Sequence, residues 1–175
     1  MNQSSRNFPK IGISRCLLGD AVRYDGKSEP NPELIKKLQE DFDLLSICPE
    51  VEAGLSIPRP AVQLTGSIKQ PQITGRDDPA LDITDLMQAY CKIKTAELSN
   101  ISGFVFKSRS PSCGLGSTPV FINGKIATQS SNGVFAQAIA DTYPGLPVAE
   151  ETNLQNHGTF EDFKISVFRY NARLE

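Results

Sequence analysis

The chain has 175 residues, a length that suits one domain with a full hydrophobic core. Its 18 basic and 20 acidic residues give a net charge of −2, which argues against a general attraction to nucleic acids or anionic membranes. Apolar residues make up 39% of the chain, and no segment approaches the ~20 apolar residues that span a bilayer. The polar start MNQSSRNFPK lacks the apolar middle of a secretory signal, so we expect a cytoplasmic protein.

Short apolar runs alternate with amphipathic segments in the first part of the chain. IGIS at 11–14 predicts a strand, and DLLSIC at 43–48 predicts a second one. Between them, residues 31–42 predict a helix, with Asn31 as its cap and Pro32 at its first position. This order is typical of a unit in which a helix connects two parallel strands.

The middle of the chain combines a long excursion with a long helix. Residues 49–80 are rich in proline and glycine and predict a loop-like segment with one short strand near 62–64. A helix is predicted over 81–99, with Asp82 or Thr84 as its cap. Its expected apolar stripe comprises Ile83, Leu86, Met87, Tyr90, Ile93 and Leu98.

The last part of the chain returns to the alternation of strands and helices. ISGFVFK at 101–107 is apolar on both sides, as expected of a buried parallel strand. PVFING at 119–124 predicts a strand edge or hairpin that turns at Asn123 and Gly124. A helix is predicted over 131–145, a final strand over 146–151 and a largely helical tail over 152–174.

This alternation predicts an α/β fold with a mostly parallel sheet, flanking helices and right-handed crossovers, in a Rossmann-like three-layer arrangement. No internal repeat or linker stands out in the sequence. We therefore expect a single domain over residues 1–175, with the motifs at about 10–150 and the helical tail at 152–174.

Three of the four cysteines follow predicted strands. Cys16 follows the first strand, Cys48 ends the second, and Cys113 lies in the turn after the third. Ligands of parallel sheets bind outside the carboxyl ends of the strands. The three thiols are therefore expected at one rim of the sheet, whereas Cys91 falls within the long helix and is expected to pack.

A shared rim leaves three interpretations of these thiols open. They could bind zinc, which usually adds a histidine or a fourth cysteine. They could bind a 4Fe-4S cluster with one iron left open, or they could be unrelated buried thiols. The sole histidine, His157, lies in a polar turn and is expected to be a surface or capping residue rather than a ligand.

Several blocks of sequence together resemble one known family. They are ISRCLLGDAVRYDG at 13–26, CPEVEAGLSIPRPAVQL at 48–64, LDITDLM at 81–87 and FKSRSPSCGLG at 106–116. In this order they resemble the thiouracil desulfidase family, over about residues 10–150. The resemblance implies non-redox, hydrolytic removal of sulfur from a free thiolated pyrimidine, which turns thiouracil into uracil and hydrogen sulfide.

The resemblance also implies a cofactor and its ligands. Cys16, Cys48 and Cys113 would hold a 4Fe-4S cluster whose fourth iron has no protein ligand. That open iron would bind the soft thiocarbonyl sulfur and polarise the carbon–sulfur bond, while a general base activates water. Glu50 is the first candidate for the base and Glu52 the second; alternatively, Glu50 caps a helix or pairs with an arginine.

The turn SRSPSC supplies hydroxyl groups next to the predicted cluster. Ser108 is the favoured catalytic serine, and Ser110 and Ser112 are further candidates for contacts with the substrate or the cluster. Serines beside proline also commonly stabilise turns. Arg23 and Arg59 are the arginines expected to orient a pyrimidine.

Other functions remain possible from the sequence. Thiolated tRNA is an alternative substrate, although the absence of a basic tract argues against it. A non-enzymatic iron–sulfur carrier or sensor would have a redox-active cluster but would release no sulfide. A structural zinc protein would be colourless.

Overall fold

A computed structural model of the chain describes residues 8–174. Residues 1–7, on which the expected lack of a secretory signal largely depends, lie outside the described residues. Within residues 8–174, no helix has both the length and the apolar composition needed to cross a membrane.

The first sheet is parallel and has four strands in the order β2-β1-β5-β8. It confirms the four strands predicted along the chain. β1, β5 and β8 are short and largely buried, which explains their apolar runs, whereas β2 is buried mainly at Ile47. Their bounds are β1 (Lys10–Ser14), β2 (Asp43–Ile47), β5 (Gly103–Phe106) and β8 (Val148–Glu150).

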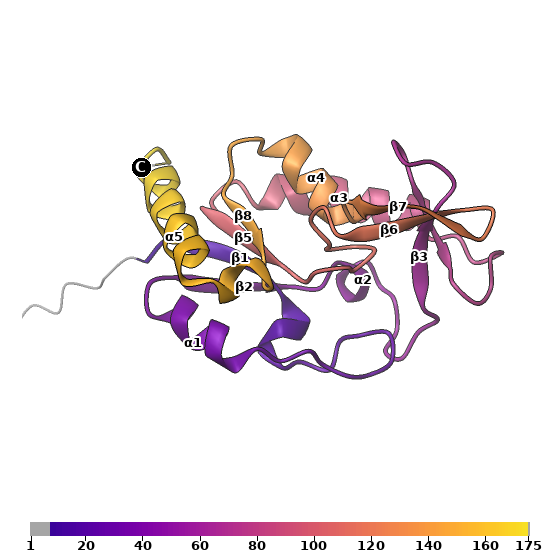
Figure 1. The fold of residues 1–175 in the computed structure, drawn as a ribbon, viewed down its shortest axis with the longest axis horizontal. Helices are drawn as coiled ribbons and strands as arrows, with labels where there is room; N and C mark the ends of the chain where they lie inside the picture. Colours follow the sequence, from indigo (N-terminus) through magenta and orange to yellow (C-terminus); the bar gives the residue numbers. More distant parts are fainter. Residues whose placement is uncertain (1–7, 175) are drawn as a thin grey trace, which may run out of the picture.

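Two pairs of helices cover the two faces of this sheet (Figure 1). The helices α1 (Pro32–Gln39) and α5 (His157–Asn171) pack on one face, and α3 (Thr84–Glu97) and α4 (Val134–Thr142) pack on the other. The side chains alternate along β1 and β5, so successive residues feed opposite cores. The predicted three-layer α/β arrangement is confirmed.

Gly12 of β1 leaves the space that a neighbouring aromatic ring fills. It pairs with Phe104 of β5, and a Cβ atom at position 12 would overlap the Phe104 ring. Phe104 is fully buried and stacks on Phe106, so the ring has no room to move. We expect Gly12→Ala to lower the free energy of unfolding by about 1–3 kcal/mol, measured by urea denaturation.

Gly145→Ala is the matched control for that substitution. A Cβ atom at Gly145 would meet only the Tyr170 ring, at an ordinary contact distance of 4.0 Å. The stability of this variant should stay close to that of the parent chain. Equal stability losses in both variants would contradict the packing explanation at Gly12.

A second sheet lies beside the first, with strands in the order β4-β3-β6-β7. The pair β3–β6 is parallel and the two outer pairs are antiparallel. The predicted hairpin turn is confirmed, with Asn123 and Gly124 at φ values of 51° and 73°. The excursion at 49–80 thus contributes two strands rather than one. The bounds are β3 (Val62–Thr65), β4 (Gln72–Gly75), β6 (Thr118–Ile122) and β7 (Lys125–Ser131).

The expected apolar stripe of α3 was partly wrong. The side chains of Leu86 and Ile93 are exposed, at 41% and 64%, whereas Met87 and Cys91 are buried. Successive residues of a helix are rotated by about 100° around its axis. Leu86 comes one residue before Met87 and Ile93 comes two residues after Cys91, so both side chains point well away from the buried stripe. The packing role expected of Cys91 is confirmed by its place in the core between α3 and α4.

Some helix boundaries differ from the prediction because residues at the predicted ends bond to other elements. The helix predicted from 81 begins at Thr84, because Leu81 and Ile83 form backbone hydrogen bonds with β4, and its N-cap residue is Ile83 rather than Asp82 or Thr84. The helix predicted from 131 begins at Val134 because Ser131 belongs to β7. The tail is helical as expected, and the His157 side chain is 88% exposed at the start of α5.

Candidate active site

Three thiols from distant parts of the chain line one cavity of about 310 Å³. Cys16 lies in the short 3-10 helix η1 (Arg15–Leu18), directly after β1. Cys48 follows β2 and precedes the one-turn helix α2 (Pro49–Glu52). Cys113 lies in the turn after β5. Because β1, β2 and β5 are parallel neighbours, their carboxyl ends bring these thiols to the same rim.

The favoured catalytic residues and the candidate substrate-binding residues also line this cavity. The lining includes Glu50, Ser108, Ser110, Ser112, Arg23 and Arg59. Glu52 is not part of the lining. The cavity volume falls at the lower end of the range for small-molecule sites.

The thiols are free of disulfides and sit in an environment that disfavours their charge. Burial raises the pKa of Cys16 to about 11, and the cation of Lys107 opposes part of this rise. Burial also raises the pKa of Cys113, which a hydrogen bond with Ser14 opposes and the charges of Cys16 and Cys48 increase. Thiolates here therefore need a bound cationic group to be stable.

The donor set is not arranged around one ion. Among residues 8–174, no three His, Cys, Asp or Glu side chains are placed to hold a single metal ion. A zinc site built from these three thiolates is therefore not preformed.

Glu50 is held rigidly at the cavity wall. Its Oε1 accepts a hydrogen bond from Ser112 Oγ at 2.8 Å, and its Oε2 pairs with Arg59 Nε at 2.7 Å. The Arg59 side chain is 6% exposed and also donates to the carbonyl oxygens of Val22 and Ser56. The pairing of Glu50 with an arginine, one of the sequence-based alternatives, is therefore present in the structure.

Glu52 faces a different environment. Its Oε1 accepts a hydrogen bond from the Cys48 backbone N–H at 3.1 Å. Its Oε2 accepts from the Tyr90 hydroxyl at 3.0 Å and pairs with Lys94 at 2.9 Å. Of the two candidate bases, Glu50 is the one whose residue borders the cavity.

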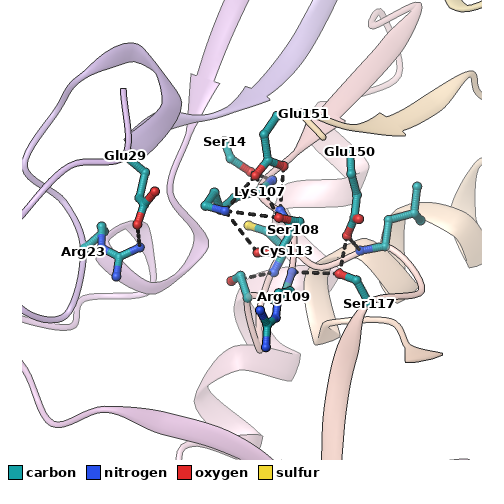
Figure 2. A network of polar contacts seen from close by, with 12 residues as sticks. Ser14, Arg23, Glu29, Lys107, Ser108, Arg109, Cys113, Ser117, Glu150 and Glu151 are labelled. Carbon is teal, nitrogen blue, oxygen red and sulfur yellow. Dashed lines mark hydrogen bonds and ion pairs between the residues drawn. The ribbon is translucent and has the colours of Figure 1, made fainter. Parts of the chain in front are cut away.

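The three serines of the turn have different partners. Ser108 Oγ donates to Glu151 Oε1 at 2.8 Å and accepts from Lys107 Nζ at 3.2 Å (Figure 2). Ser110 Oγ accepts hydrogen bonds from the backbone N–H groups of Ser112 and Cys113, so it stabilises the turn. Ser112, as described above, binds Glu50.

The turn that carries Cys113 is fixed from two sides. Glu150 at the end of β8 accepts hydrogen bonds from the Leu115 backbone N–H and from Ser117 Oγ. Ser117 Oγ in turn accepts from the backbone N–H of Arg109, a residue held at φ 62°. On the other side, the Phe135 backbone N–H at the start of α4 donates to the Ser112 carbonyl oxygen at 2.9 Å.

Sequence reasoning missed Ser14, Glu150 and Glu151 as residues around the site. Ser14 is the last residue of β1, and Glu150 and Glu151 end and follow β8. The rule used for the cysteines, that ligands gather at the carboxyl ends of parallel strands, applies equally to these positions. The pair of glutamates in LPVAEE was therefore a usable signal.

Arg23 reaches the cavity from the loop between β1 and α1. Its guanidinium pairs with Glu29 at 2.9 Å and contacts Asp25 at 3.4 Å. It also lies over the ring of Tyr24, which is a further member of the lining. Arg23 is thus anchored to its own loop while it borders the cavity.

Comparisons with known proteins place the chain in one family. The family model described as 2-thiouracil desulfurase matches residues 11–151. The uncharacterized protein YbbK of Bacillus subtilis (strain 168) is 30% identical over 152 residues, which cover 83% of this chain and 98% of YbbK. The solved structure of TudS (DUF523), a 4Fe-4S-dependent thiouracil desulfidase, is similar with a TM-score of 0.68 and 27% identity, and covers 88% of this chain and 98% of that chain. The resemblance found in the motifs is thus confirmed, and the chain belongs to the 2-thiouracil desulfurase family.

Proposed function

We propose that this chain hydrolyses a free thiolated pyrimidine, converting thiouracil and water into uracil and hydrogen sulfide, with a 4Fe-4S cluster held by Cys16, Cys48 and Cys113. The observation that carries the proposal is the meeting of these thiols with Glu50 in one small cavity. Membership of the 2-thiouracil desulfurase family and the similarity to a 4Fe-4S-dependent desulfidase support it.

The residues present suit such a cluster better than a single ion. Thiolates are the usual ligands of iron–sulfur clusters, and a cluster bound through three separate irons does not need its thiolates to meet at one point. When bound with one iron lacking a protein ligand, the cluster supplies a soft Lewis acid that polarises the thiocarbonyl group.

We assign the general base to Glu50. Its carboxylate takes a proton from the water that attacks the thiocarbonyl carbon. Ser112 and Arg59 each bind a different oxygen of Glu50, so the carboxylate is fixed before the substrate enters. In this assignment Arg59 orients the base, and Ser112 links the base to the turn that carries Cys113.

Ser108 is proposed as the contact for the pyrimidine ring. Its hydroxyl proton is directed to Glu151 and one lone pair accepts from Lys107 Nζ, so Ser108 Oγ keeps one lone pair to accept a further hydrogen bond. A ring N–H of the substrate is a suitable donor for it. Ser110 and Arg23 complete the proposed substrate contacts, with Arg23 directed at the remaining carbonyl oxygen.

The proposal also includes the working form of the protein. We infer that residues 1–175 act as one desulfidase domain, because α3 packs against both the first sheet and the second. Four free cysteines and a thiolate-bound cluster suit a reducing compartment, so we place the enzyme in the cytoplasm.

The test is anaerobic reconstitution with iron and sulfide, followed by incubation with 4-thiouracil. We expect the thiocarbonyl absorbance to disappear while uracil and sulfide form in equal amounts. The apo protein is the control and should leave the substrate intact. An intact substrate beside a fully loaded cluster would instead favour a carrier or sensor.

A further inference from the structure

The wall of the cavity carries far more positive than negative charge. Among the described residues of the lining, Glu50 is the one carboxylate. Most carboxylates that neutralise the lining cations, such as Asp20 for Arg15 and Glu151 for Lys107, stand outside the lining. Five residues of the lining thus carry positive charge, whereas most of their carboxylate partners belong to residues outside it. The cations of the lining are Arg15, Arg23, Arg59, Lys107 and Arg109.

Lys107 is the cation best placed to act on the cysteine-bound group. Its side chain is 19% exposed, compared with 39% for Arg15 and 26% for Arg23. Arg59 is more deeply buried, but its partner Glu50 lies in the same lining and offsets its charge. Lys107 therefore combines a largely buried side chain with a counter-charge on Glu151, which is not part of the lining.

The position of the Lys107 ammonium is fixed by its own hydrogen bonds. Lys107 Nζ donates to Glu151 Oε1 at 2.7 Å, to Ser108 Oγ at 3.2 Å and to the Ser108 carbonyl oxygen at 3.3 Å. Figure 2 shows the contacts that join Lys107 to Ser108 and Glu151. An ammonium with all three protons engaged cannot swing freely.

The backbone holds the same residue against the thiols. The Lys107 backbone N–H donates to Ser14 Oγ at 2.9 Å, which ties the end of β5 to the end of β1. Ser14 lies two residues before Cys16, and its hydroxyl bonds with Cys113. Of the charged residues, Lys107 has the largest effect on the pKa of Cys16, which it lowers.

We propose that Lys107, oriented by Glu151, is a positioning residue that holds a fixed positive charge beside the cysteine-bound cluster and thereby raises its reduction potential. The inference rests on the proposed function, because it requires the cluster. The physical reason is that the reduced cluster carries one more negative charge, which a nearby cation stabilises. Glu151 holds the Lys107 ammonium in place, and its own negative charge partly offsets the effect of that cation on the reduction potential.

The experiment measures midpoint potentials of anaerobically reconstituted protein by dithionite titration with electron paramagnetic resonance detection. We expect Lys107→Gln to lower the potential, because it removes the cation. Glu151→Gln should raise it, because the cation loses its counter-charge. Lys107→Arg should stay close to the parent chain. Lys164→Gln, which breaks the surface pair of Lys164 with Asp41, is the matched control and should not shift the potential.

Opposite shifts in the two glutamine variants are the result that a merely structural role would not produce. Shifts of the same sign, or no shift in either variant, would overturn the inference. If Lys107→Gln does not take up the cluster, the direction of the Glu151→Gln shift decides the question. Failure of the parent chain to bind a cluster would instead refute the proposed function, so the two failures are distinguishable.

Discussion

Replacing Glu50 by glutamine is expected to slow desulfuration by about 10²–10⁴-fold, the usual contribution of a general base. Glutamine keeps the size of the side chain and can still accept a hydrogen bond from Ser112, but it cannot take a proton from water. The initial rate of 4-thiouracil loss, normalised to the cluster content, measures the effect. Because Arg59 loses its buried partner, the folded fraction of the variant is measured alongside by thermal denaturation.

Glu52→Gln is the matched control. Glu52 lies on the same one-turn helix, two residues away, but it binds Tyr90, Lys94 and the Cys48 backbone rather than bordering the cavity. We expect its rate to stay within a few-fold of the parent chain. An equal loss of rate in both variants, or a Glu50 variant that is less stable but fully active, would remove Glu50 from the chemistry.

The substitution of Cys113 by serine is expected to have the second large effect. Without its thiolate, the protein should lose most of its iron and all of its desulfuration activity, because two protein ligands cannot hold the cluster. Iron content and the visible absorbance of the reconstituted variant measure the loss. The same result is expected for Cys16 and Cys48.

Cys91→Ser tests whether the effect is specific to the cavity. Cys91 and Cys113 are each 5% exposed and belong to the same core cluster, so the two substitutions disturb packing to a similar degree. The Cys91 variant should keep its iron and its activity. Iron binding that survives in the Cys113 variant, or that disappears in the Cys91 variant, would contradict the proposed ligand set.

The elements predicted best were those whose signals are local. The cap at Asn31 with Pro32 at the first position defines the start of α1, and the structure has the Asn31 side chain accepting the Leu34 backbone N–H. The turn at Asn123 and Gly124 was predicted because these residues tolerate positive φ. Such features depend only on residues that are neighbours in the sequence, so they can be predicted from the sequence directly.

Strands near 62–64 and 119–124 were predicted from the sequence, but β4 and the pairing that joins these strands into a second sheet were not. Its strands β3 and β4 have four residues each, and β3 pairs in parallel with β6, more than fifty residues later. Strands this short in a segment rich in proline and glycine give no clear period. The exposure of Leu86 and Ile93 likewise depends on what packs against α3, which the helical period does not specify.

By itself, the sequence determined the alternation of strands and helices and the placement of three cysteines after strand ends, from which the shared rim follows. It also carried the motifs that identify the family. Only the tertiary structure decided that Glu50 rather than Glu52 borders the cavity and that Glu151 orients Lys107. The physical reason is that the alternation of strands and helices along the chain follows from local patterns of apolar and polar residues. The partner of a polar side chain depends instead on which distant segments meet around it.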